Sequence, residues 1–169
     1  MRQEMKRFEL TDDLLTGLTD IDEDHHELLE AGNRIINPSF IHSDRKTLEE
    51  VLSFLDDYVL YHFAAEEYAM CDAGYPGVEK HCRWHKNFQE KISEYVSTGR
   101  TEGVSKELIL KISFAIEDWL IEHIRISDRD FARFLRQNNV QSVRLPGVRK
   151  LKETGSLPEN FNEQIVSGR

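Results

Sequence analysis

Apolar residues recur every three or four positions along four long stretches of the chain, and this is the period of an amphipathic α-helix. Thr19 and Asp22 form a capping-box pattern at the start of the first stretch. Residues that commonly end helices follow the first three stretches, namely Asn37, Gly74 and Gly99. The pattern predicts four helices, over residues 21–36, 48–70, 78–95 and 108–135.

Four long amphipathic helices joined by short polar loops are typical of an antiparallel up-down four-helix bundle. We therefore predict an all-α fold with the bundle in residues 1–136. The periodicity stops after Arg136, so residues 137–169 are predicted to be a C-terminal extension, a tail of uncertain structure. This tail could be a loosely docked segment, a short extra helix or the remainder of a linker, and a protein partner could bind through it.

Histidines and carboxylates occupy positions on all four stripes where a core would place apolar residues. Any one of these histidines would more often be a hydrogen-bonded core residue than a metal ligand. Burying the whole set is costly without a strong compensating charge, which a metal ion between facing helices supplies. Imidazoles and carboxylates without thiolates suit iron better than a cysteine-rich zinc site. The candidate metal ligands are His25, His62, Glu66, His81, His85, His123 and Asp128.

The spacing of these candidates is regular except in the fourth helix. His62 and Glu66 are four residues apart and therefore lie on one helical face. His123 and Asp128 are five apart, which in a regular α-helix separates them by roughly 140° around the axis. Either the aspartate reaches around the helix or the backbone widens locally into a π-type turn. Any break in the hydrogen-bond ladder of the ligand-bearing helices is therefore predicted between His123 and Asp128.

The remaining polar groups near these candidates have simpler interpretations. His26 is one position off the first stripe, about 100° around the helix, so it is predicted to face solvent. His42 lies in the loop between the first two helices and has no partner at a ligand spacing. The acidic run 20–24 and Glu67 are interpreted as solvated surface.

Composition narrows the possible functions of this chain of 169 residues. Its 22 basic and 31 acidic residues give a net charge of −9, which argues against binding to nucleic acid or to an anionic membrane. Its apolar runs are too short to cross a bilayer, and the N-terminus lacks a secretory signal, so we expect a cytoplasmic protein. Cys71 and Cys82 are too few for a disulfide framework and are interpreted as reduced thiols.

Four segments carry the candidate ligands in a specific order: a single histidine, then HxxxE, HxxxH and HxxxxD. In this order and spacing the chain resembles the hemerythrins, most closely the bacterial ones, over about residues 8–136. Asp24 stands where that family usually has glutamine, and Phe8 or Leu10 replaces its usual tryptophan before the first helix. The matching segments are GLTDIDEDHHELL (17–29), YHFAAEEYAM (61–70), YPGVEKHCRWHKNF (75–88) and WLIEHIRISD (119–128).

The resemblance implies two iron ions per chain with a bridging oxo or hydroxo group. His81, His85 and His123 would hold one iron. His25 and His62 would hold the other, and Glu66 and Asp128 would bridge the pair. In the family, the pocket for dioxygen is lined by residues that match Phe63, Trp119 and Leu120.

This ligand set leaves one coordination position open, on the iron with only two histidines. The expected function is reversible dioxygen binding for storage, delivery or sensing, without turnover, so we predict that the protein is not an enzyme. The alternatives are a di-iron oxidase or peroxidase, a protein that handles nitric oxide or iron, and a structural protein with a metal store. Ferritin-like oxidases rely on several glutamates, and the histidine-rich spacing here favours reversible binding.

Overall fold

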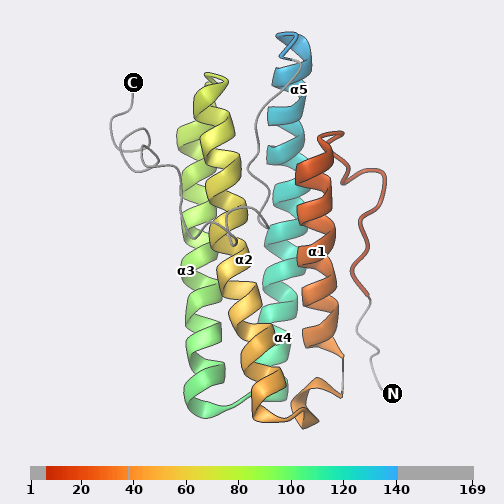
Figure 1. Ribbon diagram of the computed structural model, residues 1–169, viewed down its shortest axis with the longest axis vertical. Coiled ribbons are helices and arrows are strands. Elements are labelled where there is room, and N and C mark those ends of the chain that lie inside the picture. The colour runs from red at the N-terminus through yellow and green to blue at the C-terminus, as the bar shows by residue number, and fades with distance from the viewer. Residues whose placement is uncertain (1–6, 38, 141–169) are drawn as a thin grey trace.

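Four long helices stand side by side and alternate in direction in the computed structural model, which describes residues 7–37 and 39–140 (Figure 1). The predicted all-α up-down bundle is confirmed, and the described residues contain no strand. The first three helices are α1 (Thr19–Ile36), α2 (Arg45–Asp72) and α3 (Val78–Glu102), with a short turn of 3₁₀-helix, η1 (Phe40–His42), before α2. The fourth is continuous and consists of α4 (Lys106–Ala115), the π-helical segments η2 (Ile116–Ile121) and η3 (Ile124–Asp128), and α5 (Arg129–Gln137).

The start of α1 differs from the prediction. Thr19 is the first helical residue and caps nothing, and Leu18 at the N-cap makes no side-chain hydrogen bond. Asp22 instead accepts hydrogen bonds from the preceding loop, from the N–H and Oγ1 of Thr16 at 2.8 and 2.7 Å and from the N–H of Gly17 at 3.0 Å. The predicted capping box was therefore wrong, because Asp22 binds the loop to the helix rather than closing the helix end.

The third helix continues past the glycine that was expected to end it. Gly99 is buried inside α3, and a Cβ added there would lie 2.8 Å from Cδ1 of Leu52 on α2. This glycine allows the two helices to approach closely and does not end α3. The helix ends at Glu102, where Gly103 adopts a positive φ of 87° that glycine tolerates well.

The core of the bundle is divided into two apolar clusters by a layer of polar side chains. Each helix of the bundle packs against two others, because α1 and α3 both contact α2 and α4. The larger cluster fills most of the bundle, and a smaller one lies at the end where α2, α3 and α5 meet; its fully buried members are Ala69, Met70, Phe131 and Leu135. Along α2, Glu66 lies between Phe63 of the larger cluster and Ala69 of the smaller one, and His62 lies at the edge of the larger cluster.

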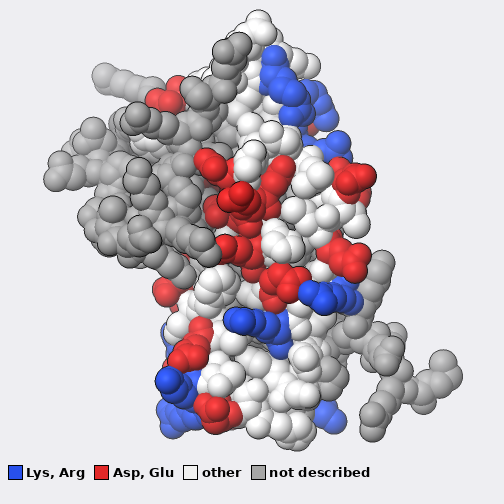
Figure 2. Space-filling model, turned by 45° about the vertical axis from the view of Figure 1, so that its right-hand side comes forward, with Lys and Arg blue, Asp and Glu red and all other residues white. Residues whose placement is uncertain are grey.

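Acidic side chains predominate across the middle of the face drawn in Figure 2, and basic ones are scattered toward its ends. The basic side chains at the upper right of this face adjoin one another, and others lie below the acidic band. Within residues 7–37 and 39–140, no helix has an apolar stretch long enough to cross a bilayer. The tail predicted from residue 137 lies outside the described residues from position 141 onward, and Gln137 itself is the last residue of α5.

Candidate metal centre

The structure brings all seven candidate ligands together in the polar layer, from four helices. Their ligand atoms form two groups, and within each group these atoms lie within 4.8 Å of one another. Glu66 belongs to both groups. Every one of the seven side chains is at most 3% exposed. The first group consists of Glu66, His81, His85, His123 and Asp128, and the second of His25, His62 and Glu66.

Three imidazoles of the first group point their Nε2 atoms at a common centre. The Nε2 of His85 lies 2.9 Å from those of His81 and His123, which are 3.1 Å apart. Three donors on one face of an octahedral metal, each about 2.1 Å from it, would be about 3.0 Å apart, against about 3.4 Å for tetrahedral donors. The triangle therefore fits one face of an octahedral site.

The two buried carboxylates each direct one oxygen toward each group. Oε2 of Glu66 lies 3.2 Å from His85 Nε2, and its Oε1 lies 3.6 Å from His62 Nε2. Oδ1 of Asp128 lies 3.1 Å from His123 Nε2, and its Oδ2 lies 3.2 Å from Nε2 of His25. A carboxylate in this position can bind two metal ions at once, one through each oxygen.

All four carboxylate oxygens of Glu66 and Asp128 make no hydrogen bond among the described residues, although imidazole nitrogens surround them. Both nitrogens of His25 are likewise without a hydrogen-bond partner there. Burial would raise the pKa of Asp128 and Glu66, but the facing imidazoles outweigh it and hold both pKa values below the usual range. Two buried, ionised carboxylates without hydrogen bonds need a cation, so the side chains present fit a metal site.

Two further carboxylates accept hydrogen bonds from the imidazole nitrogens that point away from the centre. The Nδ1–H of His85 donates to Oε1 of Glu67 at 2.9 Å, and that of His62 donates to Oδ2 of Asp24 at 3.3 Å. An ionised carboxylate only accepts, so each contact fixes a proton on Nδ1, and Nε2 is the atom that faces the centre. The interpretation of Asp24 and Glu67 as solvated surface was therefore wrong, since their side chains are only 15% and 14% exposed.

These supporting contacts join different helices, which explains why the sequence did not reveal them. Glu67 on α2 reaches His85 on α3, and Asp24 on α1 reaches His62 on α2. No fixed spacing along one helix connects the two members of either pair. The prediction that His26 faces solvent is confirmed, and His42 is exposed as well.

The protonation state of His62 depends on the carboxylates of Glu66 and Asp24. Burial lowers its pKa, but the negative charge of Glu66 and the contact with Asp24 outweigh burial and raise the pKa to about 9. Burial lowers the pKa of His85, against a smaller opposing effect of Glu66 and Glu67. In the metal-free protein, the His62 imidazole is therefore charged near neutral pH.

Aromatic rings close the side of the centre that faces the larger apolar cluster. Phe63 stacks on His85 with ring centroids 3.7 Å apart, and its ring is 5.8 Å from that of His62. Trp119 stacks on His123 at 4.6 Å, and Leu120 beside it is 1% exposed. The structure thus places Phe63, Trp119 and Leu120 beside the centre or in the core next to it, and their role toward dioxygen stays a prediction.

The backbone of the fourth helix departs from α-geometry on both sides of His123. The π-helical segment η3 (Ile124–Asp128) lies between His123 and Asp128, as the five-residue spacing predicted. A second segment, η2 (Ile116–Ile121), lies before His123 and was not predicted. The expectation that the ladder breaks only between the two candidate ligands was therefore wrong.

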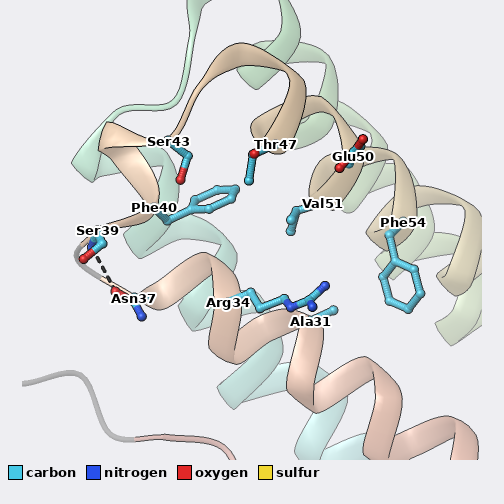
Figure 3. A pocket seen from close by; sticks show the side chains of 10 residues that line it. All are labelled: Ala31, Arg34, Asn37, Ser39, Phe40, Ser43, Thr47, Glu50, Val51 and Phe54. Carbon is cyan, nitrogen blue, oxygen red and sulfur yellow. Dashed lines mark hydrogen bonds between the residues drawn. The ribbon is translucent and has the colours of Figure 1, made fainter.

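A separate cavity of about 500 Å³ lies between the end of α1 and the start of α2 (Figure 3). Arg34, Phe40 and Phe54 are among its lining residues, and none of the seven candidate ligands lines it. This cavity is open to solvent and plays no part in the centre.

The fold and the site together define a class of protein: four-helix bundles that bury a set of histidines and carboxylates able to hold metal ions. The chain belongs to the hemerythrin family: the family model described as the hemerythrin HHE cation binding domain matches residues 16–135. The chain is also similar to proteins named bacteriohemerythrin, which come from several bacteria.

The relative from Pseudomonas paraeruginosa is 34% identical over 134 residues, which is 79% of this chain and 84% of the relative. The relative from Stenotrophomonas maltophilia is 34% identical over 122 residues, or 72% of this chain and 76% of the relative. A bacteriohemerythrin from Clostridium acetobutylicum is 24% identical over 123 residues, or 71% of this chain and 95% of the relative.

Proposed function

We propose that the protein binds dioxygen reversibly at a non-haem di-iron centre, for oxygen storage, delivery or sensing. The observation that carries this proposal is the position of Glu66 and Asp128, whose two oxygens each face a different group of imidazoles. A single metal ion would not require both carboxylates to be shared in this way. Membership of the hemerythrin family supports the same reading.

Each residue of the centre would have a definite task. His81, His85 and His123 would hold one iron, His25 and His62 the other, and the two carboxylates would bridge them. With the oxo or hydroxo bridge that the resemblance to the hemerythrins implies, one coordination position would stay open on the iron held by His25 and His62. When bound, the pair of irons supplies that position and the electrons that dioxygen accepts and returns.

The protein itself supplies orientation and a dry surrounding. Asp24 and Glu67 keep the Nδ1 protons of His62 and His85 in place, so both imidazoles present Nε2 to the irons. Phe63, whose ring lies 5.8 Å from that of His62, would exclude water from the open position. The resemblance to the hemerythrins implies the same task for Trp119, which stacks on His123, and for the buried Leu120. Exclusion of water favours release of the bound oxygen over its further reduction.

The main alternative is an enzyme that reduces oxygen, peroxide or nitric oxide at the same centre. The donor set favours binding, since five imidazoles outnumber the two carboxylates that face the metals. We therefore propose that the protein has no catalytic turnover. A protein that only handles or stores iron would show metal binding without a change of spectrum under oxygen.

Metal analysis and optical spectroscopy of the purified protein separate these functions. We expect two irons per chain, and a visible band that appears when oxygen is admitted to the anaerobically reduced protein and disappears when oxygen is removed. Zinc in place of iron, or no band, would contradict the proposal. Continuous oxygen consumption with an excess of reductant, faster than spontaneous oxidation of the centre, would identify an enzyme instead.

A further inference from the structure

The two cysteines of the chain lie on the same helix seam, next to the metal centre. The seam joins α2 and α3, which run antiparallel side by side (Figure 1). Glu67 and His85 face each other across it at 2.9 Å, and further down the seam Ser93 donates to Asp56 at 2.7 Å. These contacts fix which turns of the two helices are opposite one another.

The register of the seam places the cysteines opposite each other. Cys71 is four residues after Glu67, and Cys82 is three residues before His85. In an antiparallel pair, one turn forward on α2 corresponds to one turn backward on α3, so both cysteines lie one turn nearer the connection between the helices. Both are free thiols and only partly buried.

The electrostatic surroundings of the thiols agree with this placement. Burial raises the pKa of both thiols, and the Glu67 carboxylate raises each of them further. The pKa of Cys82, about 12, is raised by the Cys71 thiol as well. Cys71, Cys82 and Glu67 therefore share one small region at the edge of the metal centre.

We propose that Cys71 and Cys82 are a modification site that forms a reversible disulfide between α2 and α3. With hydrogen peroxide as oxidant at alkaline pH, the thiolate of one cysteine takes up an oxygen atom to give a sulfenic acid, and the O–O bond breaks with release of hydroxide, which the proton lost by the thiol converts to water. The second thiol then attacks that sulfur, the S–S bond forms, and a second water leaves. A small dithiol reverses the reaction by exchange.

The disulfide would also alter the centre, and this part rests on the proposed function. The Glu67 carboxylate raises the pKa of both thiols and accepts the Nδ1–H of His85, so it lies between the cysteines and the centre. A disulfide between α2 and α3 would fix the turn of α2 that follows Glu67, and so change how this carboxylate holds the His85 imidazole. Oxidation of the thiols should therefore shift the visible spectrum of the iron-loaded protein.

The test is cross-link mapping on the full chain, in both the iron-loaded and the metal-free form. After treatment with hydrogen peroxide and alkylation of the remaining thiols, we expect a mass lower by two hydrogens, no alkylation, and a peptide that joins Cys71 to Cys82. Dithiothreitol should restore both thiols. Alkylation of both thiols after oxidation, or oxidation to sulfinic acids without a cross-link, would overturn the proposal.

A displaced thiol is the matched control. Asp72→Cys in a Cys71→Ser background moves the thiol by one residue to an exposed position off the seam, so it should not cross-link to Cys82. Equal cross-linking of this variant and the natural pair would show that the register does not matter. Circular dichroism of each variant confirms that it folds. Because the metal-free form is tested too, the cross-link can fail or succeed independently of oxygen binding.

Discussion

Glu67 shows how a residue one position away from a candidate ligand can determine what that ligand does. Its neighbour Glu66 faces the centre, whereas Glu67 reaches across the α2–α3 seam to Nδ1 of His85. The contact selects the tautomer and fixes the ring plane, which Phe63 also holds by stacking on it. Two adjacent glutamates thus have different tasks because they lie on different faces of one helix.

Replacing this carboxylate should weaken the centre without unfolding the bundle. Glu67→Gln keeps an oxygen that can accept from His85 but removes the charge that makes the imidazole a strong ligand. We expect iron affinity to fall by about 10- to 100-fold, measured as loss of iron to a competing chelator. Glu79→Gln, on the exposed face of α3, is the control and should lose nothing. Equal iron retention in both variants would show that Glu67 does not strengthen iron binding.

Metal binding should release a proton from His62. Its pKa of about 9 means that the imidazole is charged near neutral pH in the metal-free protein, and a metal can bind only the neutral ring. Iron affinity should therefore rise with pH until about pH 9, and about one proton from this group should leave per centre near neutral pH. Titration calorimetry in buffers with different ionisation enthalpies measures the number released.

The same group affects the stability of the metal-free fold in the opposite direction. Because its folded-state pKa is raised, the His62 imidazolium stabilises the fold fully below about pH 6.5, and this contribution is lost as the pH rises through about 9. Asp24→Asn should reduce both the proton release and this pH dependence, since Asp24 helps to raise the pKa. No change in either quantity would mean that Asp24 does not contribute to the raised pKa of His62.

The π-helical backbone of the fourth helix brings two candidate ligands to the metal centre. Residues five apart can lie above one another when the backbone hydrogen bonds run from i to i+5, as in η3. This geometry brings His123 and Asp128 to the same side, with Oδ1 of Asp128 3.1 Å from Nε2 of His123. The π-turn is therefore the structural solution to a spacing that a regular helix could not accommodate.

Deleting one residue tests this explanation. Removal of the exposed Ile126 turns the five-residue spacing into a four-residue one, which a regular α-helix places on one face. We expect iron content to be kept and the thermal midpoint to fall by less than about 5 °C. Deletion of Lys86 from the regular helix α3 is the contrast, because it rotates Phe88 and Ile92 out of the core and should unfold the protein. Equal damage from both deletions would contradict the role given to η3.

The sequence predicted helices and their core faces well, but it predicted their ends poorly. The period of the apolar residues shows which face of a helix is buried. It therefore revealed the four helices and the seven polar positions on their core faces. Helix ends depend on contacts with other segments: Asp22 binds a loop, and Gly99 lies against Leu52. The segment η2 could not be predicted either, because no candidate pair with an irregular spacing spans it.

For the whole molecule, the polar layer is the feature that separates this bundle from a plain helical core. The layer lies between two apolar clusters, and the helices that contribute to it also bury apolar side chains above and below it. The apolar clusters can hold the bundle together while the layer keeps its carboxylates ionised. Sequence patterns revealed the layer because it interrupts the apolar stripes, whereas the supporting contacts of Asp24 and Glu67 join different helices and needed the structure.

Truncation after Val140 tests whether the bundle alone is sufficient for the centre. The N–H of Val140 donates to the carbonyl of Leu135 at 3.0 Å, and its side chain packs against the smaller apolar cluster, so this position closes α5. All seven candidate ligands precede it, the last being Asp128. We therefore expect the truncated protein to keep its iron content, its spectrum under oxygen and its thermal midpoint. Loss of iron on truncation would mean that residues 141–169 complete the site, whereas loss of a bound protein with the iron retained would assign that segment to partner binding and favour a sensing role.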